Sequence, residues 1–563
     1  MSGTTKKLIS TWPWLAAILT GLLYTGCLAP FNQTWLCWVA LTPLIIAIWF
    51  SGMNSRRRWL RNLSLGYVAG IVFFTGAFSW LGALGDLYKD FWLHGLSFLL
   101  SFYLGLYFAF WSWFIGLIMP RDFLSSRRNM QIAFLGASAW VAQEWIRGWL
   151  FTGFSWNGLG VALHDTWAII QIAEFTGVIG LSFVVAFGNI IVVLTPVRLF
   201  LEARAHQMRP HFDVTLTLAG LVALCTFGIF AVQNQPPSKP LRVAAVQADI
   251  PQVEKFNPQF SRKIFDRFER LSDVALHSGP RPDLLIWPEA SMPGVVREPT
   301  TEDHLFVTNL SASSKIDLLL GAVDVEAQQD YNAAILVSGV TQQMQIYRKM
   351  HLVPFGEYIP LRHSFPPFAA IASSWVPGDF ATGKDFTVFA LTNGDVRAAP
   401  LVCFEDTDGD LTRRFVLNGA NLLVNVTNDG WFLRSAGSRQ HLDNAIFRCI
   451  ETRRPMVRAA NTGVTCFVNE FGRITQILQD ETGNAFTEGV LAGEVNVPQD
   501  RQLTFYVRHG ELFAQICTGI TLLTLLFLIG VRSRRRRPNI ENADLLSNSA
   551  GGYGAESADA PHE

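Results

Sequence analysis

Residues 401–405 read Leu-Val-Cys-Phe-Glu, so that an apolar run leads directly into a cysteine and a glutamate. Two other stretches in the same half of the chain have a similar form. Leu284-Leu285-Ile286-Trp287-Pro288 leads into Glu289, and Tyr347-Arg348-Lys349 precedes another glutamate at Glu357. Short apolar runs bounded by turn signals are consistent with buried strands. The pattern therefore predicts strands that end at chemically reactive side chains.

Similar runs follow a proline-rich linker at residues 236–240. The expected strands are Leu241–Gln247, Asp283–Trp287, Asp317–Val323, Asn332–Val337, Arg397–Val402, Asn421–Val426 and Val464–Val468. Between the first two, apolar residues recur at a spacing of three to four over residues 264–274, which is typical of a helix with one buried face. Strands mixed with helices in this way predict one layered α/β domain.

The chain as a whole is too apolar for a typical soluble enzyme, which predicts a membrane part beside the α/β domain. Of 563 residues, 50% are hydrophobic and 16% are charged, against about 25% charged in a soluble domain. Lys7 and Arg56 enclose 48 uncharged residues, enough for two membrane spans because about 20 apolar residues cross a bilayer. The same reasoning predicts eight membrane helices. Their expected ranges are about 12–29, 34–51, 62–85, 91–120, 130–150, 167–197, 214–232 and 512–531.

Lysine and arginine predict the orientation of these helices. With the N-terminus inside, the short inner segments are rich in both residues, whereas Lys89 is the only such residue in a short outer loop. Cytoplasmic loops carry such an excess. We therefore expect a seven-helix bundle at 1–234, an outer catalytic domain at 235–508, an eighth helix at 509–533 and a disordered cytoplasmic tail at 534–563.

Other classes of function have no support in the composition. Lys+Arg and Asp+Glu number 45 each, so the chain lacks the basic footprint of a nucleic-acid-binding protein. The 11 histidines show no metal-binding spacing, and no glycine-rich phosphate loop is present. We therefore expect no metal, no cofactor and no nucleic-acid partner.

A thiol, a carboxylate and an ammonium group are a complete set for acyl transfer. Glu289 would take the proton of Cys403, and the thiolate would attack an acyl carbonyl. Lys349 and the backbone N–H of Phe404 would stabilise the resulting oxyanion. By spacing alone the set is only suggestive, since a buried cysteine is usually a small core residue.

The sequence around these residues resembles the nitrilase, or carbon–nitrogen hydrolase, superfamily. The blocks 287–289, 347–349 and 403–405 read WPE, YRK and CFE in the family order, and residues 351–358 read HLVPFGEY. Together with the membrane helices, the chain resembles the membrane-embedded branch of this superfamily, the apolipoprotein N-acyltransferases. Further matching blocks lie at 144–148, 152–156, 247–252, 428–432 and 458–465.

The resemblance implies an α-β-β-α sandwich seated on an eight-helix bundle, with a Glu289–Lys349–Cys403 triad supported by Glu357 and Glu405. It implies transfer of a fatty acyl chain from a phospholipid to the α-amine of a diacylglyceryl-cysteine at the N-terminus of an apolipoprotein, through a thioester on Cys403. The implied partners are phospholipid, apolipoprotein and the bilayer. The implied location is the bacterial inner membrane, with the catalytic domain on the periplasmic side.

Other residues are weaker candidates. We expect Asn332, Phe355 and Trp431 to contact substrate, with Phe355, Trp375 and Trp431 acting either as a lid or as an interfacial aromatic belt. Glu144 and Arg147 lie three residues apart on one expected helix, which predicts a structural ion pair.

Two rival functions fit the same residues. A membrane-tethered amidase would use the triad on small amides and would admit water. A non-enzymatic lipoprotein-binding module would keep its activity when Cys403 is replaced. Phe404 stands where the family often has tyrosine; this leaves the triad intact but leaves substrate preference open.

Overall fold

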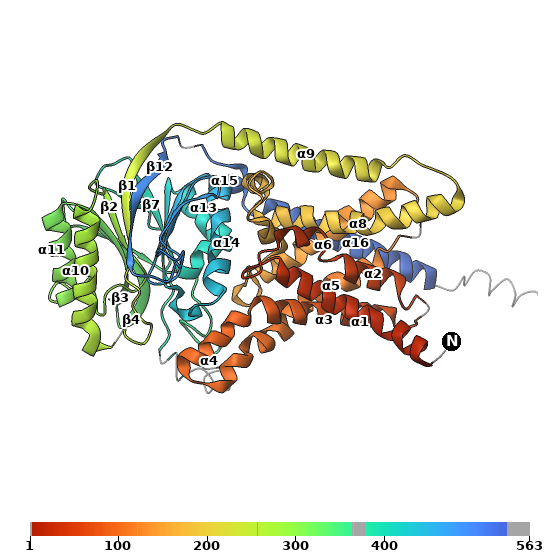
Figure 1. The fold of residues 1–563 in the computed structure, drawn as a ribbon, viewed down its shortest axis with the longest axis horizontal. Helices are drawn as coiled ribbons and strands as arrows, with labels where there is room; N and C mark the ends of the chain where they lie inside the picture. The colour runs from red at the N-terminus through yellow and green to blue at the C-terminus, as the bar shows by residue number, and fades with distance from the viewer. Residues whose placement is uncertain are drawn as a thin grey trace, which may run out of the picture.

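The computed structural model describes residues 3–53, 55–120, 122–255, 257–362, 364, 373, 376, 378–500 and 502–536. Trp375 and all of the expected tail beyond residue 536 lie outside the described residues. The chain folds into a domain of two sheets and a helical bundle, which lie end to end (Figure 1).

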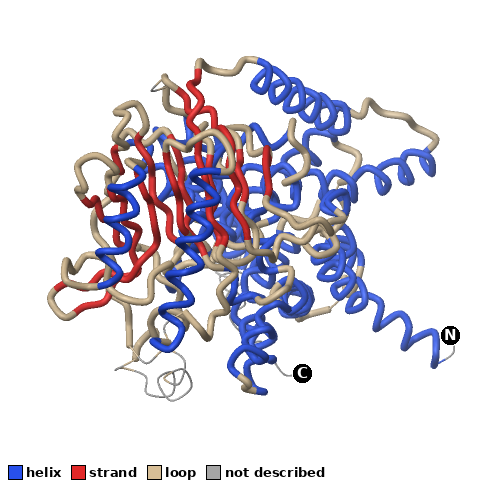
Figure 2. Tube along the Cα trace, turned by 60° about the vertical axis from the view of Figure 1, so that its left-hand side comes forward, coloured by secondary structure: helices blue, strands red, loops and turns tan. Residues whose placement is uncertain are grey.

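The domain contains two six-stranded mixed sheets. The first has the order β12 (Gly489–Pro498), β1 (Ser238–Gln247), β2 (Leu284–Trp287), β3 (Asp317–Glu326), β4 (Gln329–Val337) and β5 (Met344–Arg348). The second has the order β11 (Ile474–Ile477), β10 (Cys466–Val468), β9 (Met456–Ala460), β8 (Leu422–Thr427), β7 (Arg397–Val402) and β6 (Phe389–Ala390). Figure 2 shows their strands side by side, with helices outside them.

Helices cover the outer face of each sheet. α10 (Ser261–His277) and α11 (Glu302–Ser314) lie on one side of the domain, and α13 (Gly409–Leu417) and α14 (Gly437–Thr452) lie on the side that faces the bundle (Figure 1). The predicted α-β-β-α sandwich is therefore confirmed. Each sheet contains a parallel trio of strands, β1-β2-β3 and β7-β8-β9. Sites in such sheets form outside the carboxyl ends of parallel strands, where β2 and β7 run into Glu289 and Cys403.

The bundle consists mainly of long apolar helices. They are α1 (Gly3–Gly26), α2 (Thr42–Phe50), α3 (Arg58–Ala77), α5 (Leu96–Leu117), α6 (Ser126–Arg147), α8 (Val178–Ala205), α9 (Phe212–Gln233) and α16 (Leu512–Arg536). By length and composition, four helical segments of the described chain are able to cross a membrane, or five if α3 and the bent segment Ser79–Tyr88 form one span. The count of eight stays a prediction.

Two expected spans are shorter than the sequence suggested. Residues 34–51 form a 3₁₀ turn, Thr34–Trp38, followed by the nine-residue α2. The sixth span begins at Val178 rather than at residue 167, because Gly177 has a φ of +68° and interrupts the helix. The residues before it form short turns, Leu159–Leu163 and Ile169–Ile172, beside the domain.

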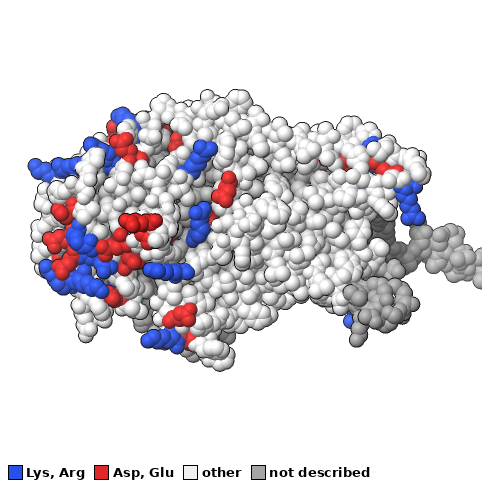
Figure 3. All heavy atoms as spheres, viewed as in Figure 1, with Lys and Arg blue, Asp and Glu red and all other residues white. Residues whose placement is uncertain are grey.

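Charged side chains are distributed unevenly between the surface of the domain and that of the bundle. On the face shown in Figure 3, charged side chains gather over the domain and at the far tip of the bundle, whereas the surface between them carries none. Lipid-facing helices have such an uncharged surface, because an ion is costly to place in hydrocarbon.

Buried polar contacts join the domain to the bundle. Gln440 of α14 accepts hydrogen bonds from Trp80 Nε1 at 3.0 Å and from Asn157 Nδ2 at 2.8 Å, and it donates to the Ala29 carbonyl at 2.7 Å. Arg453, just after α14, lies 2.6 Å from Glu174 of the bundle. Such contacts fix where the second sheet sits on the helices.

Candidate active site

The chain turns sharply at Cys403. β7 ends at Val402, and Cys403, the first residue of a short 3₁₀ helix (Cys403–Thr407), has a φ of +52°. This left-handed conformation costs a non-glycine residue roughly 1–3 kcal/mol and is concentrated at functional sites. Asn425 of β8 holds the turn by donating to the carbonyls of Leu401 at 3.2 Å and Cys403 at 3.1 Å. The sulfur is thereby placed at the carboxyl edge of the second sheet.

Glu289 and Lys349, the charged members of the predicted triad, follow strands of the first sheet. The side-chain amide of Asn332 and the carboxylate of Glu357 link them. Asn332 Nδ2 donates to Glu289 Oε1 at 2.7 Å and to Glu357 Oε1 at 2.6 Å. The other oxygen of Glu357 lies 2.9 Å from Lys349 Nζ. The second oxygen of Glu289 is buried and has no hydrogen-bond partner within the described residues. That oxygen is free to accept a proton.

Cys403, Glu289 and Lys349 also influence one another's pKa values. Burial raises the pKa of the Cys403 thiol well above its ordinary value; Glu289 adds to the rise and Lys349 opposes it. Burial raises the pKa of Glu289 as well, while Lys349 lowers it and Glu357 raises it. Burial by itself would lower the pKa of Lys349, but Glu357, Cys403 and Glu289 together raise it above the ordinary value. The resting cysteine is therefore a thiol that needs a base.

Glu405 joins the chain around Lys349 to the turn at Cys403. Its fully buried carboxylate accepts hydrogen bonds from Tyr347 Oη at 2.7 Å, Met350 N–H at 2.7 Å, His351 N–H at 3.1 Å and Val402 N–H at 2.9 Å. The chain around Lys349 is thereby tied to the turn that carries Cys403. The geometry gives Glu405 a positioning role.

Phe404 places the neighbouring Cys403 next to the bundle. Its ring stacks on Trp156 at a centroid distance of 5.6 Å and on Phe154 at 6.2 Å, both from the bundle loop that follows α6. Trp156 in turn stacks on His441 of α14 at 5.1 Å. An aromatic residue at position 404, where the family often has tyrosine, thus packs against the membrane part.

The predicted ion pair between Glu144 and Arg147 is wrong. Glu144 Oε1 accepts from Trp140 Nε1 at 2.8 Å and from the Leu159 N–H at 2.7 Å, and Arg147 donates to the Trp156 carbonyl at 3.0 Å. Both side chains therefore hold the loop that contacts Phe404. Unsatisfied backbone groups of that loop compete successfully for the two charges, because they would otherwise be buried without partners.

A second buried network is connected to the Cys403 turn. Nδ1 and Nε2 of His441 lie 3.0 Å from Asp429 and 2.8 Å from Asp406, and Arg458 contacts both carboxylates. Arg458 also donates to Asn425 Oδ1 at 2.9 Å, which links the network to the Cys403 turn. Nothing in the chain order of these residues predicted the network, since it joins four separate elements.

The expected substrate-binding residues do not form one group. The amide nitrogen of Asn332 is engaged by two carboxylates, which favours a positioning role. Phe355 is 40% exposed on the loop after Lys349, and Trp431 lies 6.4 Å from Tyr88 of the bundle, measured between ring centroids. Contact with substrate stays a prediction for all three.

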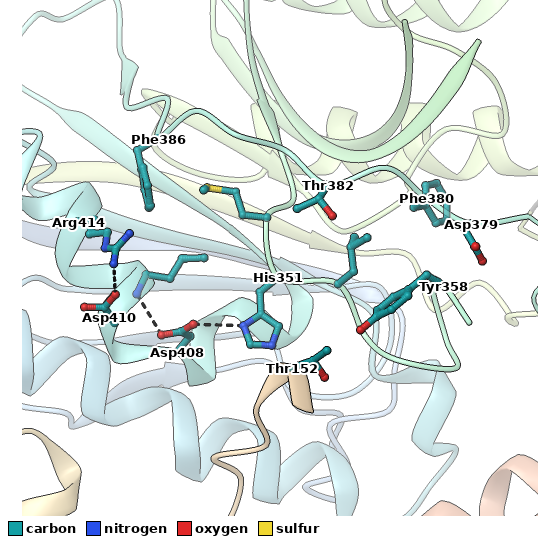
Figure 4. A pocket seen from close by; sticks show the side chains of 13 residues that line it. Thr152, His351, Tyr358, Asp379, Phe380, Thr382, Phe386, Asp408, Asp410 and Arg414 are labelled. Carbon is teal, nitrogen blue, oxygen red and sulfur yellow. Dashed lines mark hydrogen bonds and ion pairs between the residues drawn. The ribbon is translucent and has the colours of Figure 1, made fainter. Parts of the chain in front are cut away.

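A cavity of about 520 Å³ is lined in part by Met350, His351 and Leu352, the residues directly after Lys349. In Figure 4 His351 points toward Asp408, with Nδ1 at 3.2 Å from Oδ2, and Thr152 and Tyr358 lie below and beside it. Its lining includes none of Glu289, Lys349 and Cys403. The cavity therefore borders the catalytic loop but is not the triad site itself.

Comparisons with known proteins agree with this architecture. Residues 242–503 match the family model described as carbon-nitrogen hydrolase, and residues 20–191 match the model for the apolipoprotein N-acyltransferase N-terminal domain. A carbon-nitrogen hydrolase structure from Helicobacter pylori G27 superposes with a TM-score of 0.36 and 15% identity, covering 49% of this chain and 95% of that one.

Full-length relatives extend the match to the whole chain. A protein of Geobacter metallireducens named apolipoprotein N-acyltransferase is 34% identical over 90% of this chain and 93% of its own length. A protein of the same name from Chlorobaculum tepidum is 30% identical over 94% of this chain and 99% of its own. With both domain models matched in order and the similarity running nearly end to end, the chain belongs to the apolipoprotein N-acyltransferase family, within the carbon–nitrogen hydrolase superfamily.

Proposed function

We propose that this chain is a membrane N-acyltransferase that moves a fatty acyl group from a phospholipid to the N-terminal diacylglyceryl-cysteine of apolipoproteins, through a thioester on Cys403. Family membership supports lipoprotein N-acylation as the activity. The donor, the acceptor and the covalent intermediate are our inference from the chemistry of the site.

The observation that carries this proposal is the contact between Phe404 and the bundle. Because Phe404 stacks on Trp156 at 5.6 Å, the neighbouring thiol lies at the junction of domain and bundle. Substrates anchored in a bilayer by acyl chains would meet the protein at that junction. A soluble amidase would have no need to keep its nucleophile there.

In the first half-reaction, the free oxygen of Glu289 takes the thiol proton while the sulfur of Cys403 attacks the ester carbonyl of the donor. Lys349 and the Phe404 N–H stabilise the oxyanion. Collapse of the tetrahedral intermediate breaks the ester bond, and the departing lysophospholipid oxygen receives the proton from Glu289.

In the second half-reaction, the acceptor α-amine attacks the thioester carbonyl. Glu289 takes a proton from the amine, the C–S bond breaks and the proton passes to the departing sulfur. The products are an amide and the free thiol, so the enzyme returns to its starting state. Water competes with the amine, and a site that excludes water favours transfer over hydrolysis.

We propose the orientation of the chain across the membrane from the arrangement of the domain and the bundle. The domain sits at one end of the bundle, and the N-terminus lies toward the other (Figure 1). Arg58 and Arg61 lie at that other end, where they donate to the last carbonyls of α2. The positive-inside rule then places residues 235–508 on the periplasmic side of the inner membrane, 1–234 and 509–533 in it, and 534–563 in the cytoplasm.

The test is a product assay in phospholipid vesicles. Purified protein is given a diacylated lipopeptide with a free α-amine, and the triacylated product is measured by mass spectrometry. We expect product from the wild type and from the Cys225→Ala control, and none from Cys403→Ala. Full activity of Cys403→Ala, or release of free fatty acid that the lipopeptide does not suppress, would overturn the proposal.

A further inference from the structure

A second lysine lies inside the catalytic site. Lys255 follows β1 in the loop that leads to α10, and it is 2% exposed. Its Nζ donates a hydrogen bond to the backbone carbonyl of Glu289 at 2.6 Å. The reaction described above does not use this residue.

Lys255 has no carboxylate partner to explain its burial. Within the described residues, no carboxylate oxygen lies within 4.0 Å of its Nζ. Lys349, by contrast, has Glu357 at 2.9 Å. Burying an ammonium group without an ion pair is costly. Burial accordingly lowers the pKa of Lys255 to about 8, and the two groups that oppose this fall are Glu289 and Cys403.

The hydrogen bond completes the turn that presents Glu289. After β2, Gly321 N–H donates to the Pro288 carbonyl at 3.1 Å and Ser291 N–H donates to the Gly321 carbonyl at 2.8 Å. Ala290 has a φ of +47°, so the main chain reverses immediately after the catalytic glutamate. Lys255 donates to the carbonyl of Glu289, which lies in the chain between Pro288 and Ser291. Its ammonium group thereby fixes the peptide that carries the base.

The positive charge of Lys255 also acts on the side chain of Glu289. Five groups act on Glu289: Asn332, Glu357, Lys349, Lys255 and the Cys403 thiol. The positive charge of Lys349 is balanced by the carboxylate of Glu357 at 2.9 Å. Lys349 still favours a negative charge on Glu289 more strongly than Lys255 does, and Lys255 adds a second cation on the same carboxylate.

We propose that Lys255 is a positioning residue for acyl transfer: its ammonium group fixes the main chain of Glu289 and, together with Lys349, favours the ionised carboxylate that takes the thiol proton. This role rests on the proposed function, because it concerns the base of the same reaction.

The test measures the rate of Cys403 acylation in a single turnover as a function of pH, in phospholipid vesicles. Replacing Lys255 by Met removes a cation beside Glu289, so its carboxylate holds a proton more tightly. The acylation rate falls at low pH, where Glu289 is protonated, and we call this fall the acid limb of the profile. In Lys255→Met we expect the acid limb to lie about one pH unit higher than in the wild type. Acylation should then be about tenfold slower than in the wild type at pH values below the limb and equal to it at higher pH. Lys255→Arg keeps the charge and should keep the wild-type limb.

Two further variants separate charge from structure. Lys255→Gln keeps a donor for the Glu289 carbonyl but carries no charge, so it should share the shifted limb of Lys255→Met even if Met destabilises the loop. Lys263→Met removes a half-exposed lysine near the same loop, which pairs with Glu254, and should match the wild type.

The outcomes are distinct. An unshifted limb in Lys255→Gln, or an equal loss of rate at every pH that Arg does not rescue, would overturn the role of Lys255. Failure of the wild type to form any acyl-enzyme would instead overturn the proposed function.

Discussion

Glu357 Oε2 lies 2.9 Å from Lys349 Nζ, and the same oxygen accepts a hydrogen bond from the Val353 N–H at 2.7 Å. The carboxylate thus ties the catalytic lysine to the loop that follows it. Lys349 is 1% exposed, so Glu357 also balances a charge that water cannot reach. Removing one partner of a buried pair leaves the other charge uncompensated.

We therefore predict that Glu357→Gln lowers the rate of Cys403 acylation by about a hundredfold, comparable with the loss of an oxyanion-hole donor. Lys349 keeps a polar neighbour in this variant but loses its counterion. Quenched single-turnover assays with phospholipid measure the rate. Glu326→Gln, which removes an exposed carboxylate paired with Arg348 on the same sheet, is the control and should match the wild type. A Glu357→Gln enzyme with the wild-type rate would contradict the geometry.

The bond between Tyr347 Oη and Glu405 gives a stability prediction. Tyr347→Phe removes one of four hydrogen bonds to a buried carboxylate and leaves the ring in place. One such bond contributes about 1.5–3 kcal/mol when its acceptor is charged. We expect a lower melting temperature in detergent and a small loss of activity. Glu405→Ala, which removes all four bonds, should be much less stable, and equal stability of the two variants would refute a positioning role for Glu405.

The pH dependence of acylation follows from Glu289. Its burial raises the pKa above the ordinary 4.5, so the carboxylate takes up a proton at a higher pH than a surface glutamate does. The protonated form cannot accept the thiol proton. We expect the acylation rate of the wild type to fall as pH decreases through a value above 4.5. A rate that stays constant down to pH 4.5 would show that Glu289 is not the base.

His441 gives a second pH prediction, this one for stability. Burial by itself would lower its pKa, but Asp406 and Asp429 outweigh burial and the repulsion of Arg458, and the pKa is raised. Folding therefore gains from the charged imidazole below the unfolded pKa of about 6.5, and the gain is lost as pH rises through the folded pKa. The melting temperature of His441→Gln should fall furthest below the wild type under acidic conditions. A difference that grows with pH would contradict this.

The sequence predicted the parts of the fold in which a single strand or helix carries its own pattern. All seven expected strands are present, because each is a short apolar run. Five strands have no counterpart among the expected ones: β5, β6, β9, β11 and β12. β9 contains Arg458, which is fully buried by ion pairs that no local pattern reveals. β12 alternates in burial only in its second half.

Which residues of the candidate site the sequence can indicate depends on whether they lie in short recognisable blocks. The triad could be proposed because its members lie at strand ends in short recognisable blocks. The sequence does not indicate Lys255 as a site residue, because it lies a few residues beyond the 247–252 block, in a loop with no pattern of its own. Glu144 and Arg147 were paired by helical spacing, although each is held by backbone groups of a loop that spacing along one helix cannot reveal.

The central claim is that Cys403 carries an acyl chain during the reaction. Intact-protein mass spectrometry after incubation with phospholipid alone tests it most directly. We predict a mass gain of one acyl chain that maps to the peptide containing Cys403 and disappears when a diacylated lipopeptide is added. An unmodified Cys403 in a preparation that nevertheless converts lipopeptide to the triacylated product would contradict the account.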